Sequence, residues 1–504
     1  MSKNFKSFLF VFAALVQILH LFNNSNAQNI YASITIDPAT SSLAKVEGKF
    51  RWEENGRRRR NFSFLLDYAG ITNLGDRVSE VSLKSADGST VKCRRLMPGE
   101  YLAESDFDEW AYTIDLSPLK SPKAIAHISW LSAGHGILFL NDILPQADGS
   151  SSVEIKKGTV LTDFGDNSLD SFFNWYLMSQ LKVYSVFQNK NYRQVFYYAP
   201  EYRYKEIQSK RTRLSIGIEG KWKFSDEMAS KMSVDIFQYY EHLFGQRPSW
   251  FFDINIKPFP VNVDAGNYEA DTRGNYVTIV SSDAAFESES VQRLHEQLRH
   301  ELFHLWFPNG VNLTGNYDWF YEGFALYQSL KIGVALNRIR FDDYLDTLSR
   351  AYDLDRRLET KLSLIDVSNN RWSGDNNTKV YARGMLVAFL CDLALLERST
   401  GKRSTTDLLR ELYEKNRPPN TERDGNTTVL ALLREHSELT PIIKRNITGA
   451  ETIDWSDLIR AAGLAVDSTD QTTKLKVTAK LSGSQKNLLD KLGYNNWRKL
   501  ASKR

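Results

Sequence analysis

Apolar and polar residues alternate in short runs over roughly the first 220 residues of the chain. Examples are the segments 31–36, 124–130 and 212–218, in which apolar residues recur with a period close to two. This period is typical of a strand with one buried face, because successive side chains point to opposite sides of the strand. The pattern therefore predicts an amino-terminal antiparallel β domain over residues 28–222.

The pattern changes to a helical period after residue 222. Ser225 is a capping residue, and apolar residues including Met228, Met232 and Ile236 follow it at spacings of three and four. Helices and two apolar, strand-like runs continue to about residue 466. The chain is therefore predicted to be α+β, with a mainly helical second domain over residues 223–466. Residues 467–504 are expected to add a short strand and a basic helical tail.

One predicted helix carries two histidines at the spacing of a metal site, in the segment His300-Glu301-Leu302-Phe303-His304. Residues four apart lie about 40° apart around a helix axis, so both imidazoles can reach one ion. Catalytic zinc takes three protein ligands and a water, and Glu322, eighteen positions after His304, is the candidate third ligand. Glu301 is placed to act as the base that takes a proton from that water. We therefore predict one Zn²⁺ per chain.

A chance match and a structural histidine pair are the alternatives to a metal site. The chain has eight histidines in 504 residues. About 0.01 matches to this pattern, with glutamate after the first histidine, are then expected by chance. Both alternatives are weakened further by the presence of Glu322.

Composition and charge narrow the class of protein. A length of 504 residues predicts two or three domains, and the 42% hydrophobic and 25% charged content is ordinary for a soluble globular protein. A net charge of +3 gives no electrostatic reason to expect nucleic acid as a partner. Cys93 and Cys391 are too few for a disulfide framework, so two free thiols or one linking disulfide both remain open.

The first residues have the three-part pattern of a secretory signal peptide. Lys3 and Lys6 precede an apolar run over 8–22, and small residues at 25–27 precede Gln28. We therefore predict a cleaved segment at residues 1–27 and a secreted or periplasmic protein, with an uncleaved anchor as the alternative. No later segment has 18 uninterrupted apolar residues, so no membrane span is predicted in the mature chain.

The segment 300–309 and the motif Tyr321-Glu322-Gly323-Phe324-Ala325 together resemble the zinc aminopeptidases of the aminopeptidase N and leukotriene hydrolase type. In that group HExxH continues as x-Trp-Phe-x-Asn, as it does here, and the third ligand lies in x-Glu-Gly-Phe-Ala. The interval from His304 to Glu322 is one residue shorter than in aminopeptidase N, which a loop deletion can absorb. The segment 381–393 is more similar to the related glycyl aminopeptidase family. The resemblance covers residues 225–465 and implies a thermolysin-like zinc peptidase domain.

The resemblance also implies further site residues. Tyr381 resembles the family's catalytic tyrosine, whose hydroxyl donates to the oxyanion, although a tyrosine there could equally pack in the core. The family holds the substrate's amine with a glutamate in Gly-x-Met-Glu-Asn or Gly-Gly-x-Glu-His. The nearest match here is Gly266-Asn267-Tyr268-Glu269-Ala270, which makes Glu269 and Gly266 the substrate-binding candidates. An exposed acidic loop residue is the alternative for Glu269.

The expected function is therefore a zinc metallopeptidase acting on peptides or proteins, foremost as an aminopeptidase. A zinc endopeptidase is the alternative if Glu269 does not reach the site. A non-catalytic binding protein on a peptidase fold is the third hypothesis. The presence together of His300, Glu301, His304, Glu322 and Tyr381 argues against it.

Overall fold

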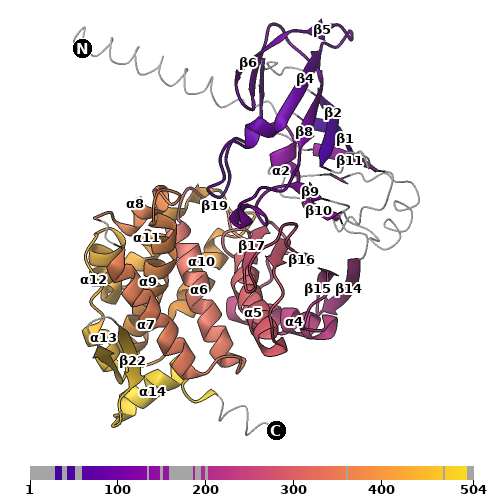
Figure 1. Cartoon of the computed structure of the whole chain (residues 1–504). Coiled ribbons are helices and arrows are strands. Elements are labelled where there is room, and N and C mark those ends of the chain that lie inside the picture. Colours follow the sequence, from indigo (N-terminus) through magenta and orange to yellow (C-terminus); the bar gives the residue numbers. More distant parts are fainter. Residues whose placement is uncertain are drawn as a thin grey trace, which may run out of the picture. The chain divides into compact units, whose positions relative to one another are not determined.

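The computed structural model describes ten segments of the chain: residues 29–36, 42–51, 60–132, 135–147, 151–157, 186–187, 195–198, 202–358, 361–468 and 472–496. The predicted signal peptide lies outside them. The chain forms two compact units (Figure 1). The amino-terminal unit comprises residues 1–201 and 260–262, and the carboxy-terminal unit comprises residues 202–259 and 263–504.

The amino-terminal unit is built from β-sheets, as the alternating pattern predicts. A seven-stranded sheet has the order β12-β11-β1-β2-β8-β4-β5, and the two smaller sheets are β3-β7-β6 and β13-β10-β9. The strands are antiparallel except for the parallel pair β1 and β11. Their bounds are β1 Asn29–Ile36, β2 Leu43–Arg51, β3 Asn61–Ser63, β4 Val78–Lys84, β5 Thr90–Val91, β6 Cys93–Met97, β7 Glu100–Ala103, β8 Glu109–Asp115, β9 Trp130–Ser132, β10 His135–Phe139, β11 Ser151–Lys157, β12 Val186–Phe187 and β13 Val195–Tyr198.

Alternation along β1 and β8 produces the core of this unit. In β1 the buried positions are Ile30, Ala32, Ile34 and Ile36, and the intervening residues are partly exposed. Aromatic side chains pack against one another in this core, including Phe50, Phe62, Trp110 and Tyr112. Two of the strands that carry these side chains, β2 and β8, are labelled in Figure 1. Short helical turns connect the strands at η1 Leu74–Arg77, η2 Pro122–Ala124 and α2 Leu140–Ile143.

A mixed five-stranded sheet of order β14-β15-β16-β18-β17 begins the carboxy-terminal unit. Strands β15, β16 and β18 are parallel, and β14 and β17 are antiparallel edge strands. Ser225 caps the helix that follows β15, as predicted, and its side chain accepts a hydrogen bond from the Met228 amide. The bounds are β14 Tyr202–Ser209, β15 Thr212–Glu219, α4 Asp226–Phe244, β16 Phe251–Pro258, β17 Tyr268–Arg273, β18 Tyr276–Ser281 and α5 Glu287–Glu301.

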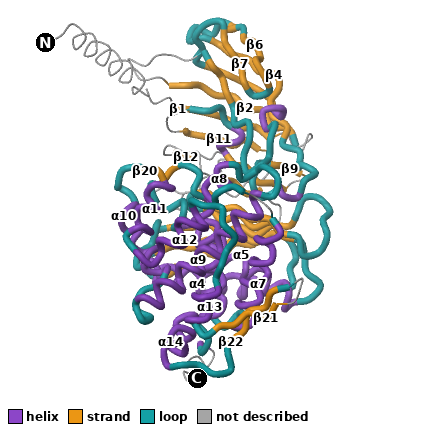
Figure 2. Tube along the Cα trace, turned by 90° about the vertical axis from the view of Figure 1, so that its left-hand side faces the viewer, coloured by secondary structure: helices purple, strands orange, loops and turns teal. Residues whose placement is uncertain are grey.

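The rest of this unit is mainly helical (Figure 2). Helix α9 lies in the middle of the helices and packs against α6, α7, α8, α10, α13 and α14. Nearly all its residues are buried, which explains its long apolar sequence. The bounds are η3 Leu302–Leu305, β19 Leu313–Thr314, α6 Asp318–Ala335, α7 Phe341–Arg357, α8 Leu364–Asn369, α9 Asn376–Arg398, α10 Thr405–Asn416, β20 Arg423–Asp424, α11 Gly425–Arg434, η4 Ser437–Leu439, α12 Thr440–Ile442, η5 Ile443–Ile447, α13 Ser456–Ala461, β21 Leu464–Ser468, β22 Thr473–Val477 and α14 Gly483–Leu492.

Both predicted domain boundaries differ from the observed units. Strands β14 and β15 belong to the carboxy-terminal unit, because β15 pairs with β16. The boundary predicted at residue 222 is therefore too late. The predicted tail over 467–504 is also part of this unit, since β22 pairs with β21 and the Leu475 amide donates to Ser349 on α7. A local period identifies a strand but does not say which sheet it joins.

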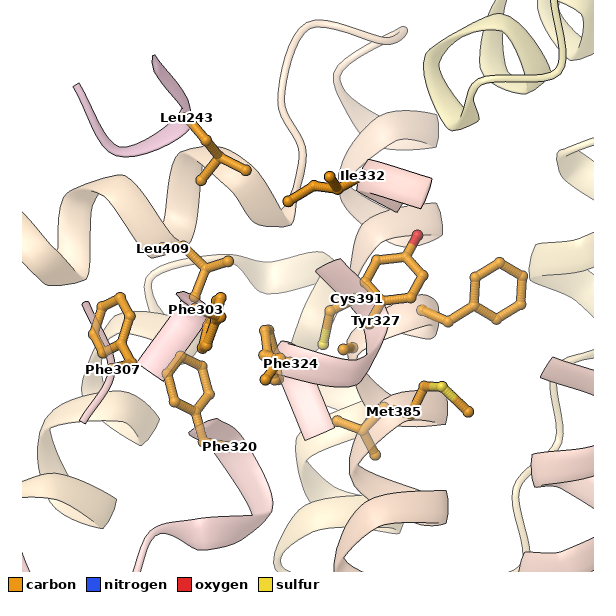
Figure 3. Close-up of a cluster of buried hydrophobic side chains, with 14 of the residues drawn as sticks. Leu243, Phe303, Phe307, Phe320, Phe324, Tyr327, Ile332, Met385, Cys391 and Leu409 are labelled. Carbon is orange, nitrogen blue, oxygen red and sulfur yellow. The ribbon is translucent and has the colours of Figure 1, made fainter. Parts of the chain in front are cut away.

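The hydrophobic core of the carboxy-terminal unit is continuous from the sheet to the helices. Figure 3 shows part of it, in which the ring of Phe307 packs edge-on against that of Phe320 at a centroid distance of 6.0 Å. Cys391 is a buried free thiol, and Cys93 in the other unit is also a free cysteine. Among the described residues, no helix is long and apolar enough to cross a membrane.

Candidate metal centre

The two histidines lie where α5 passes into the 3₁₀ turn η3. His300 is in the last turn of α5 and His304 is in η3. The apolar side of the helix fixes this segment in the core through Leu294, Leu298 and Leu302. Helix α5 begins at Glu287 with Phe286 at its N-cap position, so Ser288 and Ser290 lie inside the helix and do not cap it.

Glu322 reaches the histidines from α6. This helix begins at Asp318, which is its first helical residue and not its cap, and Tyr317 holds the N-cap position. The carboxylate of Asp318 instead accepts a hydrogen bond from Arg371 at 2.8 Å. Glu322 lies one turn further along α6 and is buried.

The structure brings the three predicted ligands together. The Nε2 atoms of His300 and His304 are 3.1 Å apart. Glu322 Oε2 lies 3.2 Å from the first of these nitrogens and 3.3 Å from the second. Tetrahedral zinc with bonds of about 2.0–2.1 Å requires ligand atoms about 3.3 Å apart. The spacing of these three atoms therefore fits a zinc ion.

The chemistry of the donor atoms also fits a cation. His304 Nδ1 donates to the Phe307 carbonyl at 2.8 Å, which leaves the Nε2 lone pair directed at the other ligands. Glu322 Oε2 is buried and accepts no well-formed hydrogen bond from the described residues. Buried lone pairs that face one another need a proton or a metal ion between them. The group His300, His304 and Glu322 therefore has the properties of a metal site.

The pKa values of the pair His304 and Glu322 are displaced in opposite directions. Burial lowers the pKa of His304, but the Glu322 carboxylate outweighs it and raises this pKa to about 9. Burial disfavours the charged form of Glu322, whereas the Arg371 and His304 cations hold its pKa well below the usual range. Without metal the pair therefore shares a proton, which a metal ion would have to displace.

Glu301 is held by a residue that the sequence did not indicate. Its Oε2 atom accepts a hydrogen bond from the Thr272 hydroxyl on β17 at 2.6 Å. Burial raises the pKa of Glu301, while the neighbouring histidines and Thr272 oppose the shift. A buried carboxylate with a raised pKa beside the metal ligands is suited to proton transfer near neutral pH. No sequence motif marks Thr272, because only pairing within the sheet places it there.

Asn309, the last residue of the HExxHxWFxN pattern, ties the strand that carries Thr272 to the histidine segment. Its Nδ2 atom donates to the carbonyls of Thr272, at 2.9 Å, and His304, at 3.0 Å. Its Oδ1 atom accepts from the Gly274 amide at 2.8 Å. Asn309 therefore positions β17 relative to the ligands.

Tyr381 lies beside the metal ligands. Its ring centroid is 6.1 Å from that of His300, and its hydroxyl accepts a hydrogen bond from Arg371 Nη2 at 2.8 Å. Arg371 also donates to Glu322, at 3.1 Å, and its involvement was not predicted. The neighbouring Arg383 is buried but turns away to Asp355 on α7, so its contacts are structural.

Glu269 and Gly266 are not brought into the ligand group. Glu269 lies on β17, three residues before Thr272. Three residues of strand span about 10 Å, and side chains an odd number of residues apart point to opposite faces. Gly266 lies in a turn before this strand with φ of +83°, next to Arg293 of α5. The role of Glu269 as the amine anchor stays a prediction.

Comparison with solved structures identifies the fold. The chain aligns with an aminopeptidase N family protein from Idiomarina loihiensis over 90% of its length and 82% of that chain, with a TM-score of 0.71 and 14% identity. An M1 zinc metallopeptidase from Deinococcus radiodurans aligns with a TM-score of 0.53 and 14% identity, and the alignment covers 83% of this chain and 93% of that one. Yeast LTA4 hydrolase aligns with a TM-score of 0.50 and 15% identity, and the alignment covers 86% of this chain and 67% of the hydrolase chain.

The chain has the fold of the M1 zinc metallopeptidases. The predicted resemblance to the aminopeptidase N and leukotriene hydrolase type is confirmed at the level of the fold, as is the order of a β-sheet region before a helical region. No protein-family model matches the chain, and no curated protein matches it by sequence. The M1 fold is thus recognisable here from the structure and from the short motifs around His300 and Glu322.

Proposed function

We propose that the chain is a zinc-dependent metallopeptidase and, more specifically, an aminopeptidase. The observation that carries the proposal is the convergence of His300, His304 and Glu322 within hydrogen-bond distance of one another, with Glu301 beside them. The M1 fold supports it, and so does a solved M1 zinc metallopeptidase mutant from Deinococcus radiodurans bound to a Tyr-Ser-Ala substrate, with a TM-score of 0.53, 13% identity and coverage of 85% of this chain and 95% of that one.

The residues of the site divide the chemistry among them. Zinc held by His300, His304 and Glu322 would supply a Lewis acid that polarises the scissile carbonyl and acidifies a water. Glu301 takes the proton of the attacking water and passes it to the nitrogen of the leaving amine. Tyr381 donates its hydroxyl hydrogen to the oxygen that becomes negative as the carbonyl turns tetrahedral.

The buried setting of Glu301 favours both of its steps. Its raised pKa makes it a better proton acceptor than an exposed glutamate, and Thr272 fixes one carboxylate oxygen. The other oxygen remains available for the water. This arrangement lets a single carboxylate receive and deliver the proton without a covalent intermediate.

A zinc endopeptidase is the second candidate function. The observation in its favour is that Glu269 lies three residues before Thr272 on β17, so that the two side chains leave opposite faces of the strand. Without a carboxylate to hold the free amine, the site would accept internal peptide bonds as well. The choice between the two functions depends on how strongly the site selects a free amino terminus.

The proposal is tested with the purified chain and two substrate sets. One set consists of amino-acid amides with free amino termini, and the other of the same substrates acetylated. We expect hydrolysis of the first set, its loss with a zinc chelator, and its recovery on addition of Zn²⁺. Hydrolysis insensitive to chelation would contradict a zinc mechanism, and strong cleavage of acetylated internal peptides would assign the endopeptidase function.

Export from the cytoplasm is a separate proposal, based on residues 1–27 alone. Amino-terminal sequencing of the protein recovered from its native compartment is expected to begin near Gln28. A protein that retains Met1 and sediments with membranes would instead be anchored by its uncleaved signal.

A further inference from the structure

Arg371 is a buried cation at the candidate metal centre, in the loop between α8 and α9. The residue is 8% exposed, and burial of an unpaired guanidinium would be strongly unfavourable. It is not a metal ligand and cannot serve as a base, because arginine does not lose its proton in proteins. Its presence beside the metal ligands therefore calls for another role.

The hydrogen bonds of Arg371 join the main groups of the site. Its Nη1 atom donates to Asp318 Oδ2 at 2.8 Å and to Glu322 Oε1 at 3.1 Å. Its Nη2 atom donates to the Tyr381 hydroxyl at 2.8 Å, and Nε donates to Asn377 Oδ1 at 2.7 Å. A guanidinium has five N–H donors, and these contacts use four of them. Little donor capacity remains for a substrate.

The hydrogen bonds from Arg371 use only some of the polar atoms of Glu322 and Tyr381. Glu322 gives Oε1 to Arg371, which leaves Oε2 facing the two imidazoles. Tyr381 accepts from Arg371 through its oxygen, so this contact does not consume its own hydrogen, and the Glu322 carboxylate also lies within hydrogen-bond reach of the hydroxyl. Arg371 thus holds Glu322 through Oε1, the oxygen that does not face the imidazoles, and it holds Tyr381 through a contact that does not consume the hydroxyl hydrogen.

Two aromatic rings flank the guanidinium. Its carbon lies 4.6 Å from the ring centroid of Trp372 and 5.2 Å from that of Tyr381. Trp372 is 52% exposed, so the ring that contacts the guanidinium also contacts solvent. Stacking on aromatic faces and exclusion of water both strengthen the hydrogen bonds that a guanidinium makes.

We propose that Arg371 is a positioning residue that sets the metal ligand Glu322 and the oxyanion donor Tyr381 at a fixed separation. This inference rests on the proposed function. It predicts one defect in metal binding, through Glu322, and a second defect in turnover, through Tyr381. A residue with only a structural role would produce neither in protein that remains folded.

The test compares Arg371→Gln and Arg371→Lys with the control Arg383→Gln. Arg383 is 3% exposed, lies two residues after Tyr381, and pairs with Asp355 instead of the site. Circular dichroism and thermal unfolding identify the variants that fold. Arg371→Lys keeps the charge and the bulk of the stem and therefore serves if Arg371→Gln does not fold, because an ammonium lacks the planar fork that holds several acceptors at once.

Zinc affinity is measured by competition with a chromogenic chelator. Both Arg371 variants are expected to bind Zn²⁺ roughly 10- to 100-fold more weakly than the unmodified chain. Arg383→Gln is expected to lower the melting temperature and to leave zinc affinity within about threefold. If the folded Arg371 variants bind Zn²⁺ with an affinity within threefold of the unmodified chain, Arg371 does not position Glu322 for metal binding.

Turnover is measured on amino-acid amides with zinc at saturation. Arg371→Gln is expected to lower kcat roughly 10- to 100-fold with little change in KM, because Tyr381 acts in the transition state. In a Tyr381→Phe background the same substitution is expected to cost less than about threefold, since the hydroxyl it holds is gone. If Arg371→Gln lowers kcat by the same factor in the Tyr381→Phe background as in the unmodified chain, Arg371 does not act through Tyr381.

The outcomes separate this inference from the proposed function. A chain that hydrolyses amides, together with Arg371 variants that match it in zinc affinity and kcat, leaves the function standing and overturns the inference. A chain that binds zinc without hydrolysing any substrate overturns the function and the role toward Tyr381, and the affinities then decide the role toward Glu322. A chain that binds no zinc overturns both.

Discussion

Gly323 on α6 and Gly384 on α9 are in direct backbone contact. A Cβ atom at Gly323 would lie 2.3 Å from the carbonyl carbon of Gly384, and one at Gly384 would lie 2.6 Å from the Trp319 carbonyl oxygen. Only glycine at both positions allows the helices to approach this closely. The contact lies next to Glu322 and one turn after Tyr381, so it sets the distance between these two residues.

Substitution at this contact is expected to destabilise the protein. Gly323→Ala places its methyl group against backbone that cannot rotate away, and we expect the free energy of unfolding to fall by about 2 kcal/mol or more. Gly483→Ala is the matched control, because a Cβ there meets no atom within 4 Å and lies at the start of α14. Equal losses in denaturant unfolding of the two variants would show that the helix contact is not tight.

Glu301→Gln is expected to separate metal binding from catalysis. The amide keeps the shape of the side chain but cannot accept the proton, so turnover is expected to fall by a factor of roughly 10³ or more. Zinc content and melting temperature are expected to stay close to those of the unmodified chain. A variant with a near-normal rate would exclude Glu301 as the base.

Thr272→Val tests the hydrogen bond that holds Glu301. Valine matches the shape of threonine but lacks the hydroxyl that donates to Oε2 at 2.6 Å. We expect kcat to fall roughly tenfold, with a smaller change in KM, because the proton acceptor is no longer held. Thr272→Ser restores the hydroxyl and is expected to recover most of the rate. Equal rates for the valine and serine variants would remove Thr272 from the site.

His295 is expected to make the fold sensitive to acid. It is 1% exposed, and burial together with the Arg299 cation lowers its pKa to about 3. The unfolded chain, with a histidine pKa of about 6.5, then binds more protons than the folded chain between these values, so stability falls as pH falls.

Between pH 8 and pH 5 this histidine contributes a loss of about 2 kcal/mol. In His295→Gln the side chain cannot be charged, so the decrease in unfolding free energy over this interval is expected to be smaller by about that amount. Denaturant unfolding at the two pH values measures it. Parallel pH dependence of the variant and the unmodified chain would contradict the assignment.

Glu269→Ala tests the predicted amine anchor. Because the side chains of Glu269 and Thr272 leave opposite faces of β17, we expect kcat/KM to change by less than about threefold on both free and acetylated substrates. A charged hydrogen bond to the amine would instead give a loss of roughly tenfold to a hundredfold on free amino termini alone. That selective loss would establish Glu269 as the anchor.

The sequence by itself determined the parts of this protein that depend on short spacings. His300 and His304 are neighbours on any helix that contains them, and the local period of β1 fixes which side chains this strand buries. The capping residue Ser225 was also recognisable, because capping involves residues within a few positions of each other. Such features need no knowledge of the rest of the chain.

The tertiary structure decided everything that depends on contacts distant in sequence. Thr272 reaches Glu301 because β17 is the edge strand beside α5, and Arg371 reaches Glu322 and Tyr381 because a loop turns inward over α6. Glu269 matched a motif by its neighbours, whereas Thr272, three residues further along β17, matched none and yet reaches Glu301. These positions follow from how sheets and helices pack around one core, and packing at long range is not encoded in any local period.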